Sequence, residues 1–176
     1  SIVIDPGHGG ADPGALRDDC LEKDITLDVA KKLAQILMKN GYNVEMTRWN
    51  DKTVSLEERV EYAESKAPDV FVSVHVNSSV TPNAYGLETH YYHEYSKELA
   101  SDIQKRMIQA TSAHNRGILQ SKFYVINHTT MPAVLVEMGF ISNDNERNAM
   151  LSQKRQTQTA NAIVDGIVEF INNKDF

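Results

Sequence analysis

Short apolar runs recur along the chain, separated by longer segments with a helical pattern. Within these runs β-branched residues follow one another without polar alternation, which is typical of strands buried on both faces of a helix-covered parallel sheet. The runs are Ile2–Ile4, Val70–Val74 and Ala133–Val136. Tyr42–Thr47 and Phe123–Ile126 are predicted to be two further strands. Leu87–Tyr92 alternates more with polar residues, so we expect it near an edge or in an antiparallel position.

Helical patterns fill the intervals between the runs. Asp24–Lys39 carries an apolar stripe and is followed by Gly41, a typical helix stop. Ser55 and Glu58 form a capping-box pattern that predicts a helix reaching Lys66. Further helices are expected over residues 96–111, after a second capping pattern at 143–146, and over 152–172. Strands that alternate with helices indicate βα units, so we predict a three-layer, mostly parallel α/β fold.

Composition and charge narrow the class of protein. A chain of 176 residues without repeats or a Gly/Ser linker fits a single domain over 1–176. With 41% hydrophobic and 24% charged residues it is not a disordered chain, and no apolar run approaches the roughly 18 residues of a membrane span. The formal net charge of −6 argues against general binding to nucleic acid or to an anionic membrane. The abrupt start on a strand-like run suggests a processed or excised domain.

Chemically reactive side chains follow each of the three buried runs. His8 lies in the Gly-rich turn after the first run, His75 follows the second and Glu137 follows the third. In open α/β sheets, ligands bind beyond the carboxyl ends of the strands, so we expect these side chains to meet. Each alone would more often be structural, but three coincident strand ends favour a functional site. Glu22, just before the first predicted helix, is placed to reach over the turn that carries His8.

Two imidazoles and one carboxylate are a donor set typical of hydrolytic zinc, with a fourth position left for water. Magnesium and calcium prefer oxygen ligands throughout. A second carboxylate would take a proton from the water and pass it to the leaving nitrogen. Glu22 and Glu137 are the two candidates for ligand and proton carrier, and their spacing does not assign them.

Other readings of the same residues are weaker. The Gly7–Gly10 turn lacks the G-x-G-x-x-G and G-K-[ST] patterns of phosphate-binding loops, and its glycines allow a tight bend that aims His8. Cys20 lies beside two aspartates that disfavour its thiolate, so we regard it as incidental. The remaining histidines are expected to face solvent: His90, His93, His114 and His128.

From Ile2 to about Ile171 the chain closely resembles the catalytic domain of zinc-dependent N-acetylmuramoyl-L-alanine amidases of the amidase-3 type. The resemblance rests on several motifs that occur in the expected order. They are Asp5-Pro6-Gly7-His8-Gly9-Gly10 with Asp12 and Gly14, Glu22-Lys23, Thr47-Arg48, Leu56-x-x-Arg59, Ser73-Val74-His75-Val76-Asn77, Gly86-Leu87-Glu88, Arg116-Gly117, and the run from Met131 to Asn143.

This resemblance implies a phosphorylase/hydrolase-like fold with a six-stranded central sheet. It implies one zinc ion per chain held by His8, Glu22 and His75, with Glu137 as the catalytic carboxylate. The implied reaction is hydrolysis of the amide between N-acetylmuramic acid and L-alanine in peptidoglycan. Three further residues are candidates for the substrate cleft, with an ion pair or a loop anchor as the alternative for each: Asn77, Glu88 and Arg116.

The resemblance also implies a secreted enzyme of the bacterial cell wall, acting as a monomer, with its leader and wall-binding segments outside this sequence. Two other functions stay open. One is a zinc peptidase on a similar sheet, which would cleave within the stem peptide. The other is a wall-binding module without catalysis, although binding alone would not require a proton-carrying Glu137.

Overall fold

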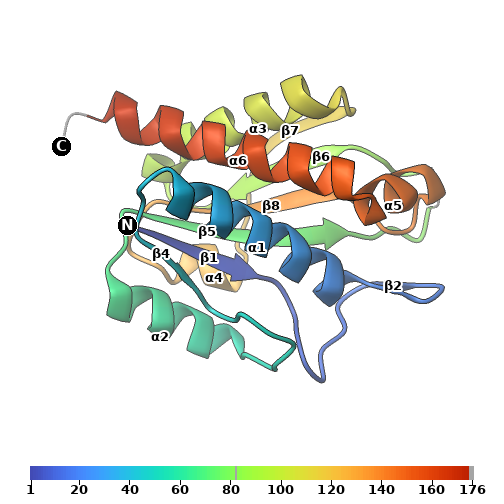
Figure 1. The fold of residues 1–176 in the computed structure, drawn as a ribbon, viewed down its shortest axis with the longest axis horizontal. Coiled ribbons are helices and arrows are strands. Elements are labelled where there is room, and N and C mark those ends of the chain that lie inside the picture. The colour runs from blue at the N-terminus through green and yellow to red at the C-terminus, as the bar shows by residue number, and fades with distance from the viewer. Residues whose placement is uncertain (82, 175–176) are drawn as a thin grey trace.

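The computed structural model describes residues 1–81 and 83–174 and places one mixed sheet between two helical layers (Figure 1). The six strands lie in the order β4-β1-β5-β8-β6-β7. Their bounds are β1 Ile2–Pro6, β4 Val44–Met46, β5 Val70–Asn77, β6 Leu87–Tyr91, β7 Asn115–Gln120 and β8 Ala133–Phe140. All neighbouring strands are parallel except β6 and β8, which are antiparallel. The predicted three-layer, mostly parallel fold is confirmed.

The two helical layers are unequal. The thicker layer holds α1 Glu22–Lys39, α3 Lys97–Thr111 and α6 Gln153–Asn173, which pack side by side on one face (Figure 1). The opposite face is covered by α2 Leu56–Lys66 and the single turn α4 Tyr124–Asn127. The remaining elements are the hairpin β2 Leu16–Arg17 and β3 Cys20–Leu21, the 3-10 turn η1 Glu94–Ser96, and α5 Asp144–Leu151. Among the described residues, no helix has both the length and the apolar character needed to cross a membrane.

The thinner layer leaves part of its face of the sheet to polar residues. A small apolar cluster fills the space under α2 and α4, with Phe71 from β5 and Leu135 from β8 among its members. Because side chains alternate along a strand, the same face continues on β5 with Ser73 and then His75, and on β8 with Glu137. Glu88 lies opposite Glu137 on the neighbouring strand β6. The apolar core therefore gives way to a row of titratable groups at this end of the sheet.

Two predictions about strands need correction. Phe123–Ile126 is not a strand, because residues 124–127 form α4. Val125 and Ile126 both pack into the small apolar cluster, which neighbouring side chains of a helical turn can do and those of a strand cannot. The sixth strand is instead β7, an edge strand with a largely exposed polar sequence. Leu87–Tyr92 was expected near an edge or antiparallel, and β6 is indeed antiparallel to β8, one position in from the edge.

Several element boundaries also differ from the predicted ones. The strands β5 and β8 run past the apolar segments, so that His75 and Glu137 lie within strands rather than after them. Helix α1 starts at Glu22, two residues earlier than expected, which puts this carboxylate in the first helical turn. Polar residues can continue a strand or begin a helix. An apolar pattern alone therefore ends β5 and β8 too early and begins α1 too late.

Candidate metal centre

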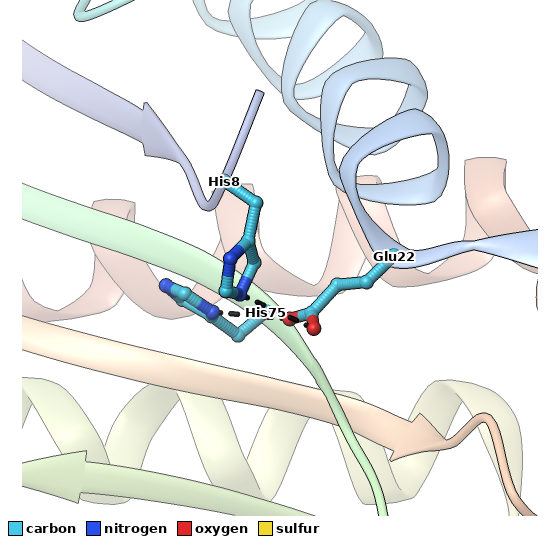
Figure 2. A group of neighbouring side chains, drawn as sticks. All are labelled: His8, Glu22 and His75. Atoms are coloured by element: carbon cyan, nitrogen blue, oxygen red, sulfur yellow. Dashed lines mark hydrogen bonds and ion pairs between the residues drawn. The ribbon is translucent and has the colours of Figure 1, made fainter. Parts of the chain in front are cut away.

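Three side chains from distant parts of the sequence converge beside the end of β1, as Figure 2 shows. His8 comes from the turn after β1, Glu22 from the first turn of α1 and His75 from β5. One donor atom of each lies within 4.8 Å of the others. The two imidazole rings meet nearly at right angles, with their centroids 5.0 Å apart. The structure thus brings together the three residues predicted as metal ligands.

Glu22 is the centre of this cluster and is almost fully hydrogen-bonded. Its Oε2 accepts from the backbone N–H of Ala15 at 2.8 Å, and its Oε1 accepts from the N–H of Val76 at 2.9 Å. The same two oxygens lie 3.2 Å from His8 Nε2 and 3.1 Å from His75 Nδ1. Burial alone would raise the pKa of Glu22, but the hydrogen bonds and charges of His75 and His8 outweigh it and hold this pKa well below its usual range. Glu22 is therefore ionised and fixed in orientation.

The other nitrogen of His8 is held by Asp12. Its Nδ1 lies 2.8 Å from Asp12 Oδ2, while Asp12 Oδ1 accepts from the N–H of Gly14 at 3.0 Å. This contact leaves Nε2 of His8 facing Glu22. A carboxylate behind an imidazole is the usual arrangement for a histidine that binds metal, because it fixes the tautomer and the ring orientation.

Replacing Asp12 tests this support. In Asp12→Ala we expect zinc affinity to fall about 10-fold to 100-fold, because His8 loses the partner that orients it. Chelator competition on the folded protein measures this loss. Asp69→Ala is the matched control, since Asp69 pairs with the amino terminus and touches no residue of the site. Unchanged affinity in Asp12→Ala would mean that His8 is oriented by other contacts.

Glu137 lies next to the metal cluster but has a different environment. It is in register with His75 on β5 and with Glu88 on β6. Its side chain is buried, and its Oε2 has no hydrogen-bond partner among the residues that the structure describes. Burial, followed by repulsion from Glu22 and Glu88, raises the pKa of Glu137 well above its usual value. The site therefore pairs a carboxylate whose ionised form is favoured with one whose protonated form is favoured.

The three residues predicted for the substrate cleft form one hydrogen-bonded group beside Glu137. Glu88 Oε1 accepts from Asn77 Nδ2 at 2.8 Å, and Glu88 Oε2 accepts from Arg116 Nε at 2.7 Å. The Arg116 side chain is 38% exposed, so its guanidinium borders solvent while it neutralises Glu88. Each of the three is thus an ion-pair or hydrogen-bond partner of another, and all lie at one end of the metal cluster.

His90 is a correction to the sequence analysis, which expected it to face solvent. It is only 5% exposed, with Nε2 3.2 Å from Glu88 Oε1 and Nδ1 2.8 Å from Ser121 Oγ. Burial lowers the pKa of this imidazole. The signal was present in the sequence: His90 stands two positions after Glu88 in a strand, so both side chains share a face. His114 and His128 are exposed as expected, and His93 is half-buried.

Among the cavities of the described chain, one adjoins the metal cluster and another lies on the opposite face of the sheet. A cavity of about 210 Å³ borders His8 and His75 and is also lined by Leu56, Arg59 and Val125. A larger cavity of about 300 Å³ lies on the other face of the sheet, where Met138 forms part of its wall. The smaller cavity is the relevant one, because it adjoins the titratable groups. Cys20 is half-buried, and burial raises the pKa of its thiol, so it is no activated nucleophile.

Comparison with known proteins shows the family to which the chain belongs. The family model described as N-acetylmuramoyl-L-alanine amidase matches residues 2–169. The chain belongs to this family. It is 42% identical over 171 residues to the uncharacterized protein YqiI of Bacillus subtilis. The match covers 95% of this chain and 82% of that protein. It is 38% identical to the N-acetylmuramoyl-L-alanine amidase LytC of the same organism, over 97% of this chain but 35% of LytC.

A solved amidase domain has the same fold. The catalytic domain of CwlV, an N-acetylmuramoyl-L-alanine amidase from Bacillus (Paenibacillus) polymyxa var. colistinus, superposes with a TM-score of 0.95 at 39% identity, covering 98% of both chains. This amidase chain is therefore an amide hydrolase. The chain spans only about a third to four-fifths of the two curated relatives named above, so those proteins contain residues with no counterpart here.

Proposed function

We propose that this amidase is zinc-dependent and hydrolyses the amide between the lactyl group of N-acetylmuramic acid and L-alanine in peptidoglycan. The observation that carries the proposal is the contrast between two neighbouring carboxylates. Glu22 is ionised and held between two imidazoles, whereas Glu137 is buried with a raised pKa and an unpartnered oxygen. Groups whose environments push their pKa values apart are suited to different roles, here metal ligand and proton carrier.

The donor set of the site fits zinc. His8 and His75 offer imidazole nitrogens and Glu22 offers a carboxylate oxygen, a combination that suits zinc better than calcium or magnesium. We assign these three residues as the protein ligands of one zinc ion per chain. Zinc, when bound, would act as a Lewis acid that polarises a carbonyl and lowers the pKa of a water molecule to about 7.

Glu137 moves the proton in the proposed reaction. Its carboxylate accepts a proton from the attacking water as the carbon–oxygen bond forms at the lactyl carbonyl. The carbon–nitrogen bond then breaks, and Glu137 gives this proton to the departing alanine nitrogen. The raised pKa of Glu137 favours the protonated form that this second step requires. The products are a free lactyl carboxylate and a free alanine amino group.

We assign Asn77, Glu88 and Arg116 to the wall of the substrate cleft. They lie beside Glu137 along the row of polar side chains, and Arg116 keeps part of its guanidinium open to solvent. An exposed guanidinium can bind carbonyl or carboxylate groups of a stem peptide. The cavity that borders His8 and His75 lies on the α2 side of the same centre.

We further propose that the chain is a single catalytic domain of a secreted enzyme, which acts as a monomer on cell-wall peptidoglycan, without nucleic acid or membrane as a partner. The relatives support the compartment, since the similar LytH of Staphylococcus aureus is named a probable cell wall amidase. The acidic net charge of −6 supports the absence of nucleic acid among the partners.

Hydrolysis of purified peptidoglycan tests this function. Chelation should abolish the release of stem peptides, and added zinc should restore it, because the attacking water depends on the metal. New alanine amino groups should appear in proportion to released peptide. New reducing sugar ends would contradict the amidase assignment, and shortened stems still attached through alanine would indicate a peptidase. A chain that binds no zinc and releases nothing would fit a wall-binding module.

A further inference from the structure

The backbone at His8 has a conformation that requires outside support. His8 has a φ of 60°, in the left-handed region that side chains other than glycine rarely adopt. Such a residue keeps this conformation only where the surrounding structure holds it there. The contacts around His8 therefore help to orient its imidazole ring toward Glu22.

Two buried arginines hold the peptide groups on both sides of His8. The carbonyl of Pro6 accepts from Arg59 Nη1 at 2.7 Å and from Arg48 Nε at 3.0 Å. The carbonyl of Gly7 accepts from Arg48 Nη2 at 2.9 Å, and the carbonyl of His8 accepts from Arg59 Nη2 at 2.7 Å. The planar guanidinium groups of the two arginines thus bind three successive carbonyls, which restricts the backbone conformation of this turn.

Arg48 also ties the His8 turn to the helix that carries Glu22. Its Nη2 donates to the carbonyl of Lys23 at 2.9 Å and to Thr26 Oγ1 at 3.1 Å. Thr26 Oγ1 in turn donates to the carbonyl of Gly7 at 2.8 Å. One guanidinium and one hydroxyl therefore fix the turn against the start of α1, and with it the separation of His8 from Glu22.

The two arginines differ in whether a carboxylate balances their charge. Arg59 forms an ion pair with the fully buried Asp5, which also accepts from Thr47 Oγ1 and Ser73 Oγ. No carboxylate of the described chain lies within ion-pair distance of Arg48, which is 1% exposed. Burial, followed by repulsion from Arg59, lowers the pKa of Arg48. A buried guanidinium without a paired carboxylate is unfavourable unless hydrogen bonds satisfy it, and the carbonyls of Pro6, Gly7 and Lys23 supply these bonds.

We propose that Arg48 and Arg59 are positioning residues of the metal centre, which set its zinc affinity by holding the His8 turn against the first turn of α1. The proposal rests on the zinc site of the proposed function. It assigns a role to the Thr47-Arg48 and Leu56-x-x-Arg59 motifs, neither of which touches the metal ligands' donor atoms. Lysine keeps the charge but has no planar fork, so it cannot bind several carbonyls in fixed directions.

Zinc affinity of Arg48→Lys and Arg59→Lys, measured by chelator competition, tests the proposal. We expect each variant to bind zinc about 10-fold to 100-fold more weakly, as for other partners that orient metal ligands. Saturating zinc should restore most of the amide hydrolysis, because the ligands and Glu137 are unchanged. Arg106→Lys is the matched control, since Arg106 pairs with Glu169 on the other face of the sheet and should keep parental affinity.

A third variant covers the case in which the lysine variants do not fold. Thr26→Val removes only the hydroxyl that joins Gly7 to Arg48 and should weaken zinc binding about fivefold, the equivalent of one hydrogen bond. Parental affinity in a folded Arg48→Lys or Arg59→Lys protein, or in Thr26→Val, overturns the proposal. A parent protein that binds no zinc would instead refute the metal centre of the proposed function.

Discussion

The variant Glu137→Gln should lose about 10³-fold in turnover while keeping its fold and its zinc. Glutamine has the shape of glutamate but cannot accept and return a proton. No hydrogen bond to Glu137 Oε2 exists in the described chain, so the exchange breaks no contact at this atom. A neutral side chain also removes the repulsion from Glu22 and Glu88 that raises the pKa of Glu137. We therefore expect thermal stability at least equal to that of the parent.

Three measurements check this result: the rate of stem-peptide release, zinc content by metal analysis, and the thermal midpoint. Glu64→Gln is a matched control, since Glu64 accepts from Thr130 near the other end of the strands and should keep full turnover. Turnover in Glu137→Gln within a factor of ten of the parent would remove Glu137 from the mechanism. Loss of zinc along with turnover would show instead that Glu137 serves as a ligand.

The second large effect is expected for Gly7→Ala, which should lose high-affinity zinc binding and all amide hydrolysis. A Cβ at this position would lie far inside van der Waals contact with His75 Cε1 and Nε2. The backbone of Gly7 is not in the left-handed region, so alanine itself is allowed there. The His75 ring has to rotate away, and the centre loses a ligand while the sheet keeps its register.

Zinc affinity in this variant should fall by more than the roughly 100-fold that follows loss of a partner behind a ligand. Gly41→Ala is the control, because no atom lies within 4 Å of its added Cβ. Its φ of 88° makes alanine unfavourable, by about 1 kcal/mol, so stability falls slightly while zinc binding is kept. If Gly7→Ala bound zinc like the parent, His75 would not be a ligand in the position seen here.

The sequence was sufficient to predict which side chains meet at the metal cluster. Buried parallel strands are recognisable in a sequence as apolar runs. Because their carboxyl ends lie at one edge of the sheet, His8, His75 and Glu137 could be expected close together. The spacing of residues was not sufficient to separate the environments of Glu22 and Glu137. These environments differ because two backbone N–H groups, of Ala15 and Val76, donate to Glu22. No spacing along the chain encodes such contacts between distant segments.

The incorrect predictions from the sequence share a physical origin, because each concerns a segment whose structure depends on tertiary contacts. Phe123–Ile126 is too short for its period to be read, and tertiary packing against the sheet decides that residues 124–127 turn as a helix. β7 has few apolar residues because an edge strand is largely exposed. The proximity of His90 to Glu88 follows from their spacing in one strand, but its contact with Ser121 depends on how distant segments fold together.

The reversal of direction between β8 and β6 has a consequence for how this domain can vary. Because β6 runs against its neighbour, Glu88 enters the site from the beginning of a strand, whereas Asn77 enters from the end of β5. The bond between these two side chains closes the base of the connection that joins the strands. Length and composition of that connection are thereby uncoupled from the spacing of the reactive groups.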